Sequence, residues 1–191
     1  MLGMLGGVVV WVAALSCGPT VTTPKIEGGV IADELHEMAE HKELRRQDPD
    51  RVYRAISVAG QRRVVEAIPD LIELLSFRYR YDWENRPRLR VSTHEMIDPA
   101  LRYPATEALA EIGQPALAAL VRVVGARNFD SLESRNARCA IRLIFRDNAR
   151  ADEFFKQAGA AADTEEARQR LLKAAQTADQ DMKLTQEDLR P

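Results

Sequence analysis

The chain contains little cysteine, few aromatic residues and almost no net charge. Only two of its 191 residues are cysteine, which is too few for a disulfide framework. Aromatic residues make up 6%, so the apolar faces depend largely on alanine and other aliphatic side chains that favour close helix packing. The formal net charge of −2 argues against wholesale binding to nucleic acid or to a membrane surface. Its length and a hydrophobic content of 46% predict one globular domain.

Residues that bind metals are also scarce, with three histidines in the whole chain. His36 and His41 are five positions apart, so the sequence HEMAEH does not place two histidines on one helix face as a zinc-protease motif does. His94 could in principle ligate a metal with Glu95 and Asp98, but a lone histidine among loop carboxylates is usually solvated. We therefore predict no metal site, no cofactor and no catalytic residue.

The N-terminal residues are apolar and uncharged as far as Ser16. Residues 8–15 have the length of a signal-peptide core and are too short to span a bilayer. The sequence Ala14-Leu15-Ser16-Cys17 resembles the lipobox of bacterial lipoproteins, with Cys17 as the lipidated residue. We expect residues 1–17 to be a signal peptide and residues 18–30 a flexible tether, which places the protein at the cell envelope. The alternatives are secretion without a lipid, an uncleaved anchor and a cytoplasmic location.

The remainder of the chain repeats one helical pattern. Ala105, Ala108, Leu109 and Ile112 follow the spacing i, i+3, i+4 and i+7 that marks one face of a helix. Gly113-Gln114-Pro115 then predicts a short turn into a second helix, because glycine adopts the left-handed conformation and proline suits a first helical turn. The same spacing starts at Val52 and Ile68, at Leu117, and at Ala137 and Ala151. The sequence therefore predicts three antiparallel helix pairs.

Such repetition is typical of helical solenoids, in which stacked pairs bury a continuous core. IPDLIELL (68–75) and YPATEALAEIGQPALAALV (103–121) resemble bacterial HEAT-like repeats of the kind related to phycobilisome-lyase modules. The resemblance covers residues 51–176. It implies an all-α superhelix of about three to four HEAT-like pairs over residues 31–178. An irregular helical bundle is the alternative.

The segments before the first pair and before the third pair carry helix-start signals. Residues 31–47 predict one charged helix with a narrow apolar face. Asp48 and Pro49 predict the N-cap and the first turn of the next helix. Asp130 and Glu133 have the spacing of a capping box.

The third helix pair contains a cysteine and is followed by two further segments of the chain. Cys139 lies beside the apolar face of its helix, which predicts a buried, inert thiol. Residues 163–176 predict a last helix with a polar outer face, in which Arg170 interrupts the apolar spacing. Residues 179–191 are polar and predict a frayed tail or a final short helix.

The step from Ile68 to Ala105 is much longer than the step from Leu117 to Ala137, so residues 77–98 predict an insertion. Its alternating pattern and turn residues indicate a β-hairpin or an ordered loop. Arginine, tyrosine and tryptophan are enriched at interface hot spots, so this insertion is the candidate partner-binding patch. Its candidate residues are Arg78, Tyr79, Arg80, Tyr81, Trp83, Arg86, Arg88 and Arg90. In the alternative interpretation the aromatic residues fold back over the repeat ends and the arginines bond helix C-terminal carbonyls.

Together these features favour a non-catalytic scaffold or adaptor that binds a protein or peptide at the bacterial cell envelope. One alternative is nucleic-acid binding through the basic insertion, against which the export signal argues. The other is an enzyme of the bilin-lyase type, an activity that the resemblance suggests but for which the sequence offers no paired nucleophile and base. Contact with a membrane is expected only through the lipid on Cys17.

Overall fold

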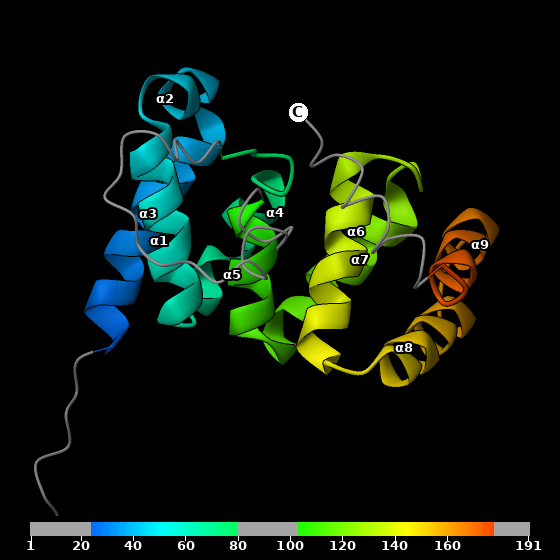
Figure 1. The fold of residues 1–191 in the computed structure, drawn as a ribbon. Coiled ribbons are helices and arrows are strands. Elements are labelled where there is room, and N and C mark those ends of the chain that lie inside the picture. The colour runs from blue at the N-terminus through cyan, green and yellow to red at the C-terminus, as the bar shows by residue number, and fades with distance from the viewer. Residues whose placement is uncertain (1–23, 80–102, 178–191) are drawn as a thin grey trace, which may run out of the picture.

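The structure, a computed structural model, describes residues 24–79 and 103–177 and is all-helical over these residues (Figure 1). The helices are α1 (Pro24–Glu40), α2 (Lys42–Gln47), α3 (Pro49–Gln61), α4 (Ile68–Glu73), α5 (Pro104–Ile112), α6 (Leu117–Ala126), α7 (Leu132–Phe145), α8 (Asn148–Ala160) and α9 (Glu165–Ala174). Two single turns of 3-10 helix, η1 (Val65–Ala67) and η4 (Gln114–Ala116), lead into α4 and α6. The all-α prediction is confirmed for this part of the chain.

The first helices of the predicted pairs form a row. Helix α1 packs against α3, α3 against α5 and α5 against α7, while α4 packs against α5 and α6 (Figure 1). The row forms because each helix buries the apolar face that its sequence spacing predicts. All members of the quartets that start at Val52 and Ala105 are buried. Each of the other quartets has half-buried members, which are Ile72, Leu117, Val121, Ile144, Phe154 and Ala158. The core therefore runs between the helices of the row and the second helices beneath them.

Helix boundaries follow the predicted signals in two places. The Asp48 carboxylate accepts a hydrogen bond from the backbone N–H of Arg51 at 2.9 Å, which confirms Asp48 as the N-cap of α3 with Pro49 in its first turn. Gly113 has φ +84°, and Pro115 lies in the turn η4 that begins the second helix. The predicted short turn between α5 and α6 is therefore confirmed.

Helices α3 and α5 approach each other closely at Gly60. A Cβ built on Gly60 would lie 2.6 Å from the Cα of Ala108, which is closer than real Cβ atoms come to backbone. Only glycine fits this position at the observed spacing of the two helices. The close contact joins the C-terminal end of α3 to the middle of α5.

Several boundaries differ from the sequence predictions. Helix α1 begins at Pro24, so residues 24–30 of the predicted tether are its first turns. The single helix expected over 31–47 is interrupted at His41, which separates α1 from α2. Helix α7 is capped by Ser131, whose hydroxyl accepts from the N–H of Ser134 at 3.2 Å, and not by the predicted pair of Asp130 and Glu133.

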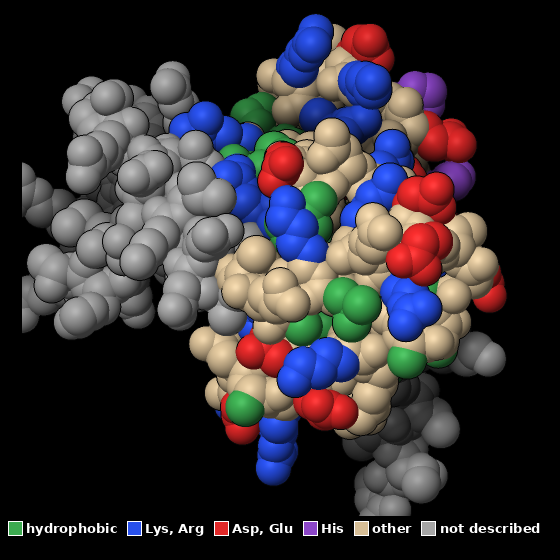
Figure 2. Space-filling model, turned by 90° about the vertical axis from the view of Figure 1, so that its right-hand side faces the viewer, with side chains coloured by type: hydrophobic (Ala, Val, Ile, Leu, Met, Phe, Trp, Pro, Cys, Tyr) green, Lys and Arg blue, Asp and Glu red, His purple; other side chains and the backbone are tan. Residues whose placement is uncertain are grey.

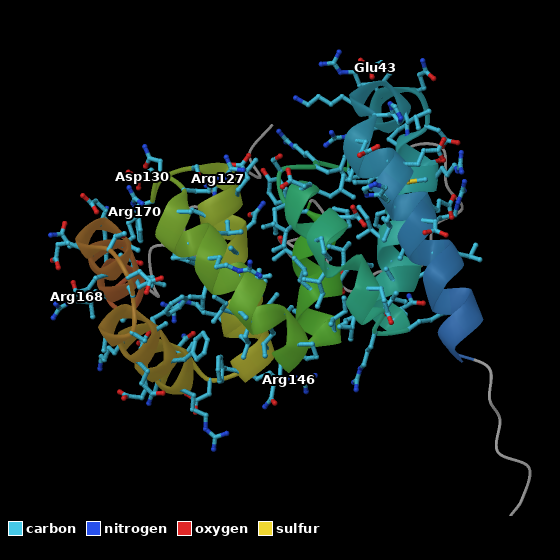
Figure 3. All side chains as sticks on the ribbon, turned by 180° about the vertical axis from the view of Figure 1, so that it is seen from behind. Glu43, Arg127, Asp130, Arg146, Arg168 and Arg170 are labelled. Atoms are coloured by element: carbon cyan, nitrogen blue, oxygen red, sulfur yellow. The ribbon has the colours of Figure 1, made fainter. Side chains whose placement is uncertain are left out.

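The last helix occupies a position that the repeat pattern did not predict. Helix α9 packs on α6, where a Cβ on Gly125 would lie 3.3 Å from the Cβ of Ala167. Arg170 of α9 donates to the Gly125 carbonyl at 2.6 Å, and Figure 3 shows Arg170 near Arg127, the residue after α6. The residue that interrupts the apolar spacing therefore bonds the C-terminal end of α6. Helix α8 packs against α7, its partner in the predicted third pair, and against α9 (Figure 1).

Two arginines of α7 are buried and were not predicted to be so. Arg138 is 2% exposed, donates to the Phe129 carbonyl at 2.7 Å and places its guanidinium 3.9 Å from the Phe129 ring centroid. The ammonium group of Lys173 lies 4.1 Å from the same centroid, so α9 also contacts this ring. Arg142 is 6% exposed and bonds Asp152 of α8. These contacts join α7, α8 and α9 by polar as well as apolar interactions.

Candidate functional site

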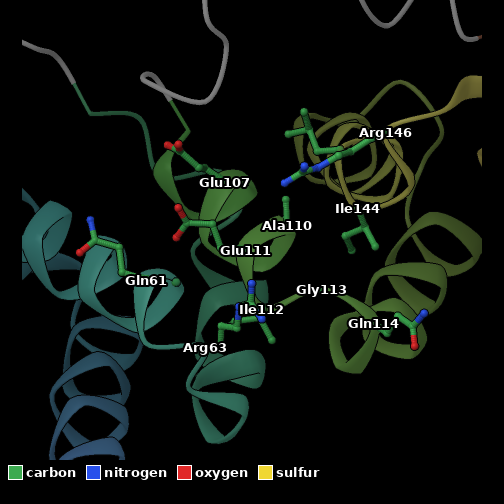
Figure 4. Close-up of a pocket in the computed structure, with 12 residues that line it drawn as sticks. Gln61, Arg63, Glu107, Ala110, Glu111, Ile112, Gly113, Gln114, Ile144 and Arg146 are labelled. Carbon is green, nitrogen blue, oxygen red and sulfur yellow. The ribbon is translucent and has the colours of Figure 1, made fainter.

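A groove lies at the C-terminal ends of α3, α5 and α7, and we call it the α3–α5–α7 groove (Figure 4). It is open to solvent and has a cavity volume of about 890 Å³. Helix α5 lies in the middle of it, with α3 on one side and α7 on the other. Its lining residues are Gly60, Gln61, Arg63, Glu107, Ala110, Glu111, Ile112, Gly113, Gln114, Leu143, Ile144 and Arg146.

A smaller cleft continues the groove between α3 and α5. It has a volume of about 150 Å³ and shares Gln61, Glu107 and Glu111 with the main cavity. Its other lining residues include Tyr53 and Pro104 at the far end. The combined surface therefore crosses three consecutive helices of the row and extends along α3 toward its N-terminus.

Each of the three helices leads into a residue with positive φ that lines this groove. Gly113 has φ +84°, while Arg63 and Arg146 have φ +53° and are the two non-glycine residues of positive φ in the described part of the chain. A residue with a Cβ in the left-handed region costs roughly 1–2 kcal/mol. A cation at a helix C-terminus recovers about 0.3–1 kcal/mol. The cost exceeds the recovery, so glycine would be less strained than arginine at the positions of Arg63 and Arg146.

Charges of both signs line the groove. The carboxylates of Glu107 and Glu111, one turn apart on α5, point toward α3 and Gln61 (Figure 4). The Arg146 guanidinium comes from the α7 side and extends toward Ala110 (Figure 4). Both glutamates and both groove arginines are exposed. Glu107 and Glu111 thus face α3, whose end also brings Arg63 into the groove, while Arg146 forms a basic side toward α7.

An apolar side chain lies at the basic side. Leu143 is 47% exposed and lines the groove, with the half-buried Ile144 beside it. Leucine with this much exposed surface offers apolar area that a partner could bury at roughly 25 cal/mol per Å². The basic side of the groove therefore combines a charge with an apolar contact.

The predicted partner-binding patch falls mostly outside the described residues. Arg80, Tyr81, Trp83, Arg86, Arg88 and Arg90 lie there, and so does Cys17 with the rest of the predicted signal sequence. Arg78 is exposed, as a binding residue would be. Tyr79 is buried with 4% exposed: its ring stacks on Tyr53 at a centroid distance of 4.3 Å and its hydroxyl donates to Asp50 at 2.5 Å. Tyr79 therefore attaches the chain to α3, as the alternative interpretation expected for the aromatic residues.

Other candidate residues have structural partners. The His36 ring nitrogen lies 2.9 Å from the Asp70 carboxylate of α4, and its second nitrogen 3.4 Å from Glu40. The hydrogen bond to Asp70, with the charges of Asp70 and Glu40, raises the pKa of His36 above its ordinary value. Cys139 is half-buried, where a buried thiol was predicted. Within residues 24–79 and 103–177, no group of three or more His, Cys, Asp or Glu side chains is arranged to hold a metal ion.

Two further surface features lie outside the α3–α5–α7 groove. A shallower cavity of about 430 Å³ between α4 and α6 is lined mainly by apolar residues, with Arg122 and Arg127 among them. On the face seen in Figure 2, lysine and arginine side chains are interspersed with acidic ones. This mixture agrees with the small net charge and does not form a continuous basic stripe on that face.

The groove residues Arg63, Arg146, Glu107, Glu111 and Leu143 were not singled out from the sequence. The turn after Gly60 is longer than its counterpart at Gly113, and this was the one available signal that α3 ends in an unusual way. For the other residues there was no signal, because the groove forms only when three separate helix ends come together.

Comparison with known proteins gives no match: no protein-family model, curated protein or solved structure is significantly similar to the chain. The likeness to HEAT-like repeats therefore rests on the sequence pattern. In the described residues no single helix is long and apolar enough to cross a membrane; the bent pair Pro104–Ile112 and Gln114–Ala126, with a bend of 113°, meets the length and composition criteria only when taken together.

Proposed function

We propose that this protein is a non-catalytic binding module, built as a short HEAT-like solenoid, that holds a protein or peptide partner in the α3–α5–α7 groove. The observation that carries this proposal is the groove itself, which crosses three consecutive helices of one row. Consecutive helix ends in repeat proteins form extended binding surfaces of this kind. A cavity of about 890 Å³ that is open to solvent suits a polypeptide segment better than an enclosed small molecule.

The chemistry of the groove also supports recognition. Its side chains are carboxylates, guanidiniums, amides and aliphatic groups at mostly exposed positions. Catalytic sites instead gather a nucleophile, a base and an oxyanion donor in a desolvated setting. Exposed charges at the rim of an interface steer and select partners, whereas exposed apolar side chains such as Leu143 supply binding energy.

The proposed place of action is the bacterial cell envelope. This proposal rests on the resemblance of Ala14-Leu15-Ser16-Cys17 to a lipobox. A mass that begins at Cys17 and carries acyl chains, measured on protein from the native host, would support it. A mass that retains Met1 without lipid would reject the lipoprotein assignment and bring intracellular partners back into consideration.

Site-specific crosslinking in the native host tests the groove directly. A photoreactive amino acid replaces Leu143 in one variant and Val65 in a control variant. The two side chains are exposed to a similar extent, 47% and 48%, but only Leu143 lines the groove. We expect a discrete adduct from position 143 and none from position 65. Absence of an adduct at 143, or identical adducts at both positions, would reject the groove as the binding site.

A further inference from the structure

The two arginines at strained backbone positions carry an inference about the partner, which rests on the proposed binding function. Arg63 and Arg146 both have φ +53° and both line the groove. Neither guanidinium forms a hydrogen bond or an ion pair with the described part of the chain. No side-chain hydrogen bond or ion pair within the described residues offsets the strained backbone there, and the guanidinium group remains available to a ligand.

We propose that the groove binds an extended peptide segment that carries an acidic residue for Arg146 and a basic residue for Glu111 of α5. The carboxylate of Glu111 is exposed and makes no ion pair with the described residues. An acidic peptide side chain bonds a guanidinium through charge-assisted hydrogen bonds, and a lysine or arginine bonds a carboxylate in the same way.

The arrangement of the helices sets the spacing between the two peptide residues. Arg146 and Glu111 come from the neighbouring helices α7 and α5, and the axes of adjacent packed helices lie about 8–10 Å apart, so we take this distance as the scale for the peptide. An extended chain advances about 3.3 Å per residue. The acidic and basic residues of the peptide are therefore expected two or three positions apart, with an apolar residue near the acid to contact the exposed side chain of Leu143.

A phage-displayed library of random peptides, panned against the full chain, is the probe for this pairing. The baits are the unchanged protein, Glu111→Lys and Arg146→Glu. We expect the unchanged protein to enrich peptides with an acid and a base two or three positions apart. The Glu111→Lys bait should lose the preference for the base, and the Arg146→Glu bait should replace the preferred acid by a base.

The outcomes separate this inference from the binding function. Peptides that crosslink to position 143 but lack the pair of charges, or that are unaffected by both inversions, overturn the charge inference and leave the binding function in place. If the unchanged protein enriches no peptide above the bare matrix, the peptide inference is overturned, and the crosslink at position 143 decides the binding function separately.

Replacement of each groove arginine by glycine provides a second, independent readout. Glycine adopts positive φ without strain, so Arg63→Gly and Arg146→Gly should leave the melting temperature unchanged or raise it. Affinity for the enriched peptide should fall about tenfold for Arg146→Gly, the usual loss for one charge-assisted contact. Arg150→Gln, on α8 and away from the groove, removes a charge as a matched control and should not alter affinity. Unchanged affinity of Arg146→Gly overturns the proposal.

Discussion

The guanidinium of Arg142, in the last turn of α7, donates a hydrogen bond to the backbone carbonyl of Ala174 at the end of α9 at 2.8 Å. The same side chain bonds the Asp152 carboxylate of α8 at 2.9 Å. One buried side chain therefore forms hydrogen bonds to both α8 and α9. At α9 it bonds the C-terminal end, where the last carbonyl groups lack partners within the helix.

Arg142→Met is expected to destabilise the protein by about 1–3 kcal/mol, because the buried carbonyl of Ala174 loses its donor and Asp152 loses its counterion. Urea unfolding followed by circular dichroism measures the change. Arg150→Ala removes the exposed pair with Asp147 and should cost no more than about 0.5 kcal/mol. Equal losses in the two variants would contradict the role assigned to Arg142.

Gly60→Ala is expected to destabilise the protein by about 1–3 kcal/mol, since its Cβ would meet the backbone of Ala108 at 2.6 Å. Thermal unfolding is the measurement. Gly29→Ala is the matched control, because a Cβ at that helical position meets no atom within 4 Å. This control should gain about 0.5–1 kcal/mol from the improved helix propensity. A neutral Gly60→Ala variant would mean that α3 and α5 lie farther apart.

Asn136→Asp tests a buried bond between α7 and the segment after α4. The Asn136 amide donates to the Leu75 carbonyl at 2.7 Å, and an ionised carboxylate cannot do so. We expect a loss of about 1–3 kcal/mol at neutral pH, with partial recovery in acid when the carboxyl becomes protonated. Asn128→Asp is the control, because its oxygen already accepts from the N–H of Asp130 and the side chain is exposed. A loss that does not vary with pH would reject this bond.

His36 gives a pH prediction whose sign follows from its partners. The hydrogen bond to Asp70 is the largest cause that raises the pKa of His36 in the folded protein above the value of about 6.5 for an unperturbed histidine. The stabilisation from this pair is therefore fully present below about pH 6.5 and is lost as the pH rises through the folded value. Proton NMR titration of the ring measures the shift. Asp70→Asn should lower the pKa of His36, and an unchanged titration would show that the contact is absent in solution.

The sequence was most informative where local chemistry decides the structure. The quartets starting at Val52 and Ala105, the N-cap Asp48 and the turn at Gly113 each depend on neighbours within a few positions, and each is confirmed. The position of α9 was not predictable in this way. It depends on Arg142 and Arg170 reaching carbonyls far along the chain, at Ala174 and Gly125.

The candidate site was less predictable for a related reason. A periodicity analysis treats arginine as a surface residue, so it gives no sign that Arg63 and Arg146 adopt the left-handed conformation. The sequence directed attention to residues 77–98, which lie mostly outside the described residues, whereas Tyr79 proved to be buried against Tyr53. A groove that joins the ends of α3, α5 and α7 appears only in three dimensions.

The position of α9 beside α6 also bears on how the protein is synthesised. Gly125 contacts Ala167, and Phe129 lies under the Lys173 ammonium group, so α6 and α7 bury these surfaces only against a helix made later. While the nascent chain emerges from the ribosome, α1 to α6 can pack in order of appearance, but α7 lacks its acceptor at Ala174. We expect the C-terminal part of the core to close only after translation has passed α9, and the nascent chain to remain susceptible to proteases until then.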